Sequence, residues 1–85
     1  MKTIKVHQLA NNQFEIVTPK GTYFQSYNSI IAFKPNDKRR IQLDNYYWNY
    51  SRTTSKYRNQ FLNEYIADTR AKIESKEYLL TDLNN

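Results

Sequence analysis

The sequence has no cysteine, one glycine and one histidine in 85 residues. Without cysteine the chain forms no disulfide and offers no thiolate, which fits a reducing cytoplasm. A single glycine excludes a glycine-rich phosphate loop, and one histidine without cysteine excludes the usual zinc sites. The longest apolar run, SIIAF, is strand-sized and far too short to cross a bilayer, so we expect no membrane association.

The residues that could support catalysis are few and scattered. His7 falls beside Lys5 on a predicted strand and has no evident acidic or nucleophilic partner, and the carboxylates do not form pairs. The N-terminal segment MKTIKVHQL lacks the apolar region of an export signal. We therefore expect a cytoplasmic binding protein without a cofactor or metal, and not an enzyme.

Positive charge is concentrated in the middle of the chain. Thirteen basic and eight acidic residues give a formal net charge of +5. Residues 34–58 alone hold seven basic residues against Asp37 and Asp44, and the remainder balances at six against six. Such an excess either favours an anionic partner such as nucleic acid or simply keeps the protein in solution.

The first half of the sequence predicts short strands. Alternating apolar and polar residues indicate five of them, at residues 3–7, 14–18, 22–28, 29–34 and 39–44. Turn-forming residues separate them at ANNQ, at TPKG with the only glycine, at Asn28–Ser29 and at PNDK. The alternation predicts that one side of each strand faces inward. The inward side chains are predicted to be Ile4, Val6, Phe14, Ile16, Phe24, Ser26, Ile41 and Leu43. In the fourth strand, Ile31 and Phe33 are predicted to lie on one side and Ile30 and Ala32 on the other.

The apolar period changes to that of a helix after Asn45. Tyr57, Phe61 and Tyr65 lie four residues apart and predict a helical part at about 53–75, either one helix or two with Asp68 capping the second. A hydroxyl at Ser51, Thr53 or Thr54 can cap its start. Residues 77–83 predict a final strand or a frayed helix end. The expected fold of the single domain, 1–85, is therefore α+β: an antiparallel meander with one or two helices on one face.

Residues 45–61 hold six of the thirteen aromatic residues, interleaved with basic ones. Single-stranded nucleic acid is bound by stacking bases on aromatic rings beside cations that neutralise phosphate. The candidate binding residues in this segment are Tyr46, Tyr47, Tyr50, Arg52, Lys56 and Arg58. Alternatively, Trp48 and two of these tyrosines only fill the junction between sheet and helix.

Two further groups are candidates. Tyr23, Gln25 and Tyr27 would project from the outer face of the sheet as a stacking platform, or would only form stabilising cross-strand pairs. The competing register of this strand would bury the tyrosines and expose Phe24. The loop with Lys38, Arg39 and Arg40 either steers a nucleic acid or is a solvated turn.

Arg58 falls near the centre of the apolar arc of the predicted helix. An arginine at such a place either forms a half-buried ion pair with a carboxylate such as Asp44 or contacts an anionic ligand.

Two stretches of the sequence resemble a family of small phage proteins of uncharacterised function. The first is YFQSYNSIIAF, in which the matching residues are Phe24, Gln25, Ser26 and Tyr27. The second is YWNYSRTTSKYRNQFL, in which they are Trp48, Tyr50, Ser51, Thr53, Thr54, Lys56 and Tyr57. In such proteins we expect a glycine after position 62 and another before the final tyrosine, where this chain has Asn63 and, in the second place, Lys76 and Glu77.

This resemblance implies a phage or prophage origin and a setting in the host cytoplasm. The roles that it implies are nucleic-acid binding in replication or expression, or inhibition or adaptation of a host enzyme, for example a defence nuclease. In either role the partner, nucleic acid or host protein, would meet the aromatic and basic residues named above. A homo-oligomer formed through an exposed edge strand is a third expectation.

Overall fold

The structure is a computed structural model that describes residues 4–85, so the predicted start of the first strand at Thr3 lies outside the described residues. Six strands and two helices follow one another along the chain: β1 (Lys5–Ala10), β2 (Gln13–Val17), β3 (Gly21–Ser26), β4 (Ser29–Pro35), β5 (Gln42–Asp44), α1 (Arg52–Leu62), α2 (Ile66–Glu74) and β6 (Leu79–Thr81).

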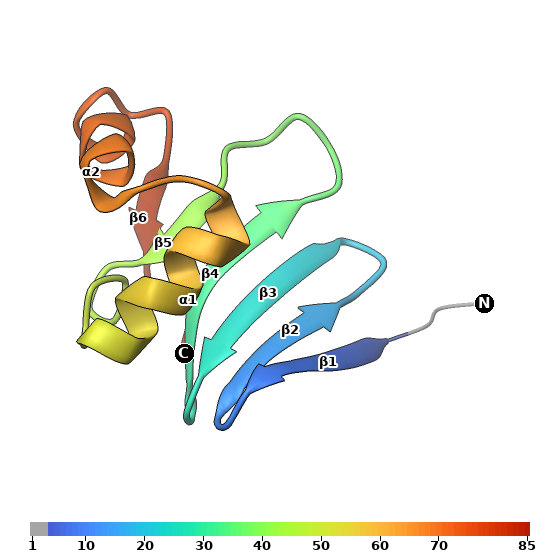
Figure 1. The fold of residues 1–85 in the computed structure, drawn as a ribbon. Coiled ribbons are helices and arrows are strands. Elements are labelled where there is room, and N and C mark those ends of the chain that lie inside the picture. The colour runs from blue at the N-terminus through green and yellow to red at the C-terminus, as the bar shows by residue number, and fades with distance from the viewer. Residues whose placement is uncertain (1–3) are drawn as a thin grey trace.

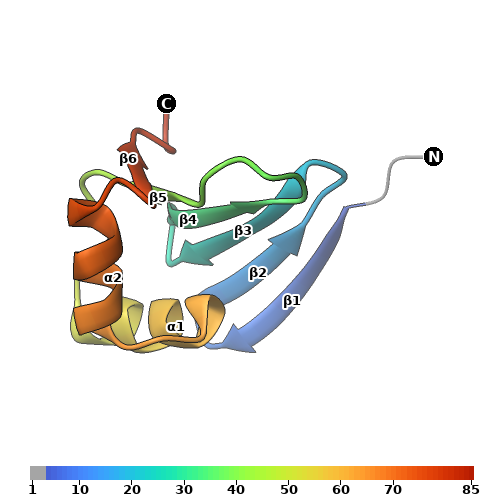
Figure 2. The same cartoon turned by 90° about the horizontal axis from the view of Figure 1, so that it is seen from above.

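The strands form one sheet in the order of the sequence (Figure 1). β1 to β5 pair antiparallel with their neighbours, and β6 pairs parallel with β5 after the chain has passed through both helices. Both helices lie on the same side of the sheet (Figure 2). The structure thus confirms the α+β class, the five-strand meander and the final strand, and it resolves the helical part into two helices.

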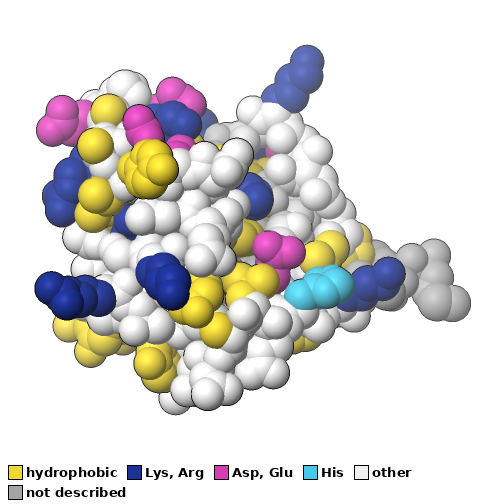
Figure 3. Space-filling view, in the orientation of Figure 1, with side chains coloured by type: hydrophobic (Ala, Val, Ile, Leu, Met, Phe, Trp, Pro, Cys, Tyr) yellow, Lys and Arg dark blue, Asp and Glu magenta, His cyan; other side chains and the backbone are white. Residues whose placement is uncertain are grey.

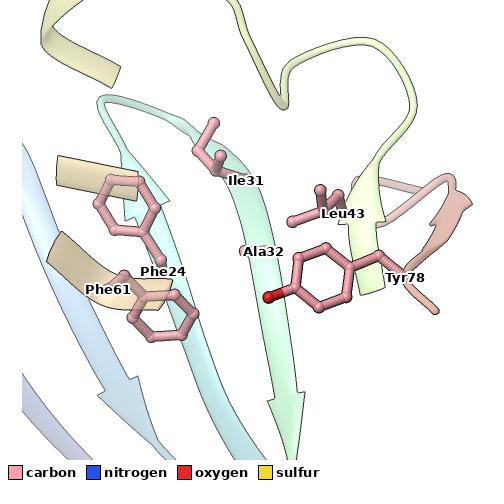
Figure 4. Packing of buried hydrophobic residues seen from close by; sticks show 6 residues of the cluster. All are labelled: Phe24, Ile31, Ala32, Leu43, Phe61 and Tyr78. Atoms are coloured by element: carbon pink, nitrogen blue, oxygen red, sulfur yellow. The ribbon is translucent and has the colours of Figure 1, made fainter. Parts of the chain in front are cut away.

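The core lies between α1 and the strands β3, β4 and β5. Phe24 and Phe61 stack with ring centroids 5.7 Å apart, which fastens α1 to the sheet. Tyr78, from the segment after α2, closes the other end of the core (Figure 4). The remaining fully buried members of the cluster are the aliphatic residues Ile31, Ala32 and Leu43.

A bulge in β4 changes which side chains face the helices. Phe24 pairs with Ala32 and Gln25 pairs with Ile30, so Ile31 has no partner and points to the helix side together with Ala32. The predicted grouping of Ile31 with Phe33 is therefore wrong: Phe33 lies on the opposite face of the sheet.

The outer strands depart from the prediction in the same way. Val6 pairs with Ile16, and Ile16 pairs with Tyr23, which points away from α1. Phe14 and Ile16 thus lie on the face that carries no helix, and the expectation that they point inward with Phe24 is wrong. The period of alternation is as predicted, but on a strand far from the helices it does not say which face is covered.

Within residues 4–85, four residues other than glycine have a left-handed backbone and form turns. Asn12 joins β1 to β2, and Tyr27 joins β3 to β4 one residue earlier than the predicted turn. Asn63 ends α1 with φ of 56°, and Lys76 follows α2 with φ of 68°. These last two lie where glycine was expected, so this chain makes the same bends without it.

The start of α2 also differs from the prediction. The interpretation with two helices places Asp68 at the cap of the second, but α2 begins two residues earlier, at Ile66, with Tyr65 as its N-cap. The Asp68 carboxylate accepts the backbone N–H of Tyr65 at 3.2 Å from within the first turn. An acidic residue in this place stabilises the helix through its dipole and its free N–H groups.

Glu64 holds the connection between the helices against the end of the sheet. Its carboxylate accepts hydrogen bonds from Lys72 Nζ at 2.8 Å, from Tyr78 Oη at 2.9 Å and from the Thr69 hydroxyl. Burial alone would raise the pKa of Glu64, but these three donors outweigh it and keep the pKa below the ordinary value. Burial next to the same carboxylate raises the pKa of Tyr78 to about 12.

Glu64→Gln should destabilise the protein at neutral pH by about 1–2 kcal/mol, because Lys72 loses its charged partner. The pKa of Glu64 is lower in the folded chain than its ordinary value of 4.5, so the unfolded chain takes up the proton first. The contribution is present above that value and is lost as the pH falls through the folded-state pKa. Chemical denaturation between pH 3 and 7 should therefore show the stability gap between parent and variant closing in acid.

The matched control is Glu74→Gln, which neutralises an exposed carboxylate on α2 without an ion pair among residues 4–85. This variant should unfold like the parent at every pH. A stability gap for Glu64→Gln that stays constant down to pH 3 would contradict the assigned role of the carboxylate.

Candidate nucleic-acid interface

The loop from β5 to α1, residues 45–51, carries three tyrosines that contact one another. The ring centroids of Tyr46 and Tyr47 lie 4.7 Å apart, and those of Tyr47 and Tyr50 lie 5.3 Å apart. Tyr46 and Tyr50 are 70% and 63% exposed. This tyrosine cluster, Tyr46, Tyr47 and Tyr50, thus presents two rings to solvent on a base formed by the third.

Asp44 fixes the start of this loop. One oxygen of its buried carboxylate accepts the backbone N–H groups of Tyr46 at 3.1 Å and Tyr47 at 2.8 Å. The other oxygen accepts the backbone N–H of Leu83 and the side-chain amide N–H of Asn84. Burial alone would raise the pKa of Asp44, but these hydrogen bonds outweigh it and hold the pKa below its ordinary value. A carboxylate satisfied in this way can stay ionised without a cationic partner.

Arg58 fixes the second half of the loop. Its guanidinium is fully buried and donates to the Trp48 carbonyl at 2.7 Å, the Asn49 side chain at 3.2 Å and the Asn59 side chain at 2.9 Å. It also lies 5.3 Å from the Trp48 ring. Burial lowers the pKa of Arg58 below its ordinary value. Neither sequence interpretation describes this residue: it pairs with no carboxylate among residues 4–85, and it is not available to a ligand.

Arg52 and Lys56 are both exposed, one turn apart on α1, directly after the tyrosine cluster. Ser51, one of the three hydroxyl residues that the sequence offers for this cap, caps the helix end by accepting the backbone N–H of Thr54 at 3.2 Å. Figure 3 shows basic side chains gathered over the first half of α1, with hydrophobic side chains next to them. Exposed rings and exposed cations therefore lie side by side here.

The turn between β3 and β4 meets the same end of α1. The Ser26 and Thr54 hydroxyls lie 2.9 Å apart in the interior. This contact places Tyr27, the next residue after Ser26 and 51% exposed, near the first turn of the helix. Ser26 gave no sign of this role in the sequence beyond its predicted inward direction.

The other predicted site residues lie elsewhere. Tyr23 and Gln25 point from the face of the sheet that carries no helix, and Tyr23 stacks on Phe33 at 4.4 Å. The loop with Lys38, Arg39 and Arg40 lies at the opposite end of β5 from the tyrosine cluster (Figure 1). Lys38, Arg39 and Arg40 thus form one group and Arg52 with Lys56 another, and the candidate interface contains only the second. Lys34 belongs to neither, because its Nζ donates to the Phe61 carbonyl at 2.8 Å.

The alternative interpretation of residues 45–61 is that their aromatic side chains only fill the junction between sheet and helix, and it is correct for some of them. Trp48, Tyr47 and Tyr57 pack in part against the core cluster. Tyr46 and Tyr50 do not belong to it and remain exposed. The segment therefore both closes the core and forms the surface, with different residues for each.

Residues 4–85 show neither a metal-binding cluster nor a membrane-spanning helix. They hold no group of three or more His, Cys, Asp or Glu side chains placed to bind a metal ion. Within the same residues, neither helix has the length and apolar character needed to span a membrane.

Fold and surface together define a small α+β protein with an exposed aromatic and basic surface at the start of its first helix. By its sequence the chain belongs to a family of unknown function, DUF8033, whose match covers residues 2–79. Comparison with curated proteins and with solved structures gave no match.

Arg58→Met should destabilise the protein by about 1–3 kcal/mol, because the Trp48 carbonyl and the Asn49 side chain lose their buried donor. Trp48 is the only tryptophan, so its fluorescence reports on this place alone. We expect its emission to shift to longer wavelength as the loop loosens, and denaturant unfolding to begin earlier.

Arg70→Met is the matched control, because Arg70 also lies over the Trp48 ring, at 5.6 Å, but is exposed. It should change stability by less than about 1 kcal/mol. Equal effects of the two substitutions would show that the ring contact, and not the buried hydrogen bonds, holds the loop.

Proposed function

We propose that this chain is a phage or prophage protein that binds single-stranded nucleic acid in the host cytoplasm, as a binding protein and not an enzyme. The observation that carries the proposal is the adjacency of two exposed rings, Tyr46 and Tyr50, and two exposed cations, Arg52 and Lys56. Each exposed ring can stack one base, worth about 1–3 kcal/mol, and each cation can neutralise a phosphate.

The way the loop is held supports this proposal. Asp44 and Arg58 fix the backbone on both sides of the tyrosine cluster through buried hydrogen bonds. A surface fixed in advance loses less conformational entropy when a ligand binds. The net charge of +5 further favours the approach of a polyanion.

Labelled single-stranded DNA, single-stranded RNA and duplex DNA, titrated with the protein at about 50 and 200 mM salt, test the proposal by fluorescence anisotropy. We expect the single strands to bind more tightly than the duplex, with affinity falling steeply as salt rises. Arg52→Glu with Lys56→Glu should weaken binding at least about tenfold. Tyr46→Ala with Tyr50→Ala should weaken it while leaving the salt dependence nearly unchanged.

The control is Lys5→Glu with Lys20→Glu, which makes the same change in net charge at two exposed lysines away from α1. It should bind nearly as well as the parent. Absence of binding at 50 mM salt, or equal losses in the two charge-reversed variants, would reject the proposed interface.

A second candidate function uses the same surface for a protein: a module that inhibits or adapts a host enzyme, for example a defence nuclease. Tyrosine and arginine are enriched at the energetic centres of protein interfaces, which favours this candidate at Tyr46, Tyr50 and Arg52. Capture from nuclease-treated host lysate should then yield a stoichiometric protein partner, and Arg52→Glu with Lys56→Glu should lose it. An empty capture would count against this function.

A further inference from the structure

The face of the sheet that carries no helix bears an uninterrupted row of uncharged side chains. The pairing register connects one residue from every strand: Val6, Ile16, Tyr23, Phe33, Gln42 and Leu79. A second row runs beside it through Gln8, Phe14, Gln25 and Ile30. Neither row contains a charged residue, although a quarter of the chain is charged.

The residues of β1 show that the lack of charge on this face is not a consequence of burial in the monomer. Lys5 to Leu9 are exposed, because no helix covers either face of this edge strand. Even so, Lys5 and His7 point to the helix side and Val6, 60% exposed, points to the uncharged face. β2 divides in the same way, with Glu15 on the helix side and Ile16 on the uncharged face. On these two strands the charged residues thus lie on the helix side and not on the uncharged face. Asp44 in β5 follows Gln42 by two residues and shares its face, but its carboxylate is buried.

We propose that the uncharged face is the dimerisation surface of this protein, on which two copies pack sheet against sheet. A second copy fits for an electrostatic reason. Two chains of net charge +5 repel each other. The rows themselves carry no charge, and Lys38, Arg39 and Arg40 border this face only at its β5–β6 end, where they line a hollow with Gln42 and Leu79. Two copies that set the β1 edge of one against the β6 edge of the other therefore meet without bringing these like charges together. In a two-fold symmetric dimer the same surface of both copies meets, so this surface must be complementary to itself. Rows of aliphatic, aromatic and amide side chains meet this condition.

The size of the face agrees with a dimer of moderate affinity. Six strands about 4.8 Å apart, with the longer strands about 20 Å in length, give a flat area of about 500 Å². The molecule, at 37 × 30 × 25 Å, accommodates such a face. This area is smaller than the about 800 Å² per partner that a standard interface buries, and Phe33 in the middle of the row is already only 7% exposed. We therefore expect dissociation in the micromolar range.

Sheets stacked in this way lie about 10 Å apart and leave the helices on the outside. The two surfaces at Tyr46, Tyr50 and Arg52 would then face solvent on opposite sides of the dimer. The proposed dimerisation does not depend on the proposed function, because the two use different faces.

Sedimentation velocity and light scattering of the full chain from about 5 to 500 μM test the dimer. The mass should rise from 10.3 kDa toward twice that value. Val6→Lys places a charge in the row and should raise the dissociation constant at least tenfold. Leu79→Lys, at the other end of the row and 40% exposed, should do the same. Both positions are exposed in the monomer, so circular dichroism should show an unchanged fold.

His7→Lys is the matched control, because it adds the same charge on the same edge strand but on the other face. It should dimerise like the parent. Three results would overturn the proposal: a parent that stays monomeric at 500 μM, a Val6→Lys variant that dimerises as well as the parent, or an equal loss in His7→Lys. The last result would indicate pairing through the edge of β1.

Discussion

The exposed tyrosine surface of this protein depends on one constraint, the fully buried Arg58, to which the loop 45–51 is hydrogen-bonded. The Arg58 guanidinium donates only to neutral oxygens, those of Trp48, Asn49, Ser55 and Asn59. Removing such a charge from water is costly, and each of these hydrogen bonds offsets part of that cost only while the loop keeps its path. The loop and helix α1 are therefore fixed together, and the exposed tyrosines are placed by a residue that no partner can touch.

Asp44 completes this arrangement from the sheet. It is an anion that is buried without a cation, just as Arg58 is a cation that is buried without an anion. The loop between them supplies two N–H groups to Asp44 and two oxygens to Arg58. The other partners come from Leu83 and Asn84 for Asp44, and from side chains of α1 for Arg58, whose Nε has no hydrogen-bond partner among residues 4–85. Two buried charges thus define the direction of one loop, and a direct ion pair between them would have left those loop groups without partners.

The sequence predicted what depends on local periodicity and turn chemistry. The strands, the helical part, the cap at Ser51 and the left-handed Asn12 follow from patterns within a few residues. The side of the sheet that the helices cover depends on a bulge at Ile31 and on how far α1 reaches, and neither leaves a local signal. For the same reason the partners of Arg58 were not predictable: the Trp48 carbonyl is a backbone group brought near by the fold.

The parallel strand β6 has a consequence for the order of folding. β1 to β4 are joined by short turns and can form from neighbouring segments as the chain is synthesised. β5 has only one strand beside it until residues 79–81 have been made, and Asp44 lacks two of its donors until Leu83 and Asn84 follow. Pairing of β6 with β5 closes a long loop that contains both helices. Closing such a loop costs conformational entropy, so this pairing forms late. During synthesis the tyrosine loop would thus be the last part of the molecule to reach its final shape, after the meander has already formed.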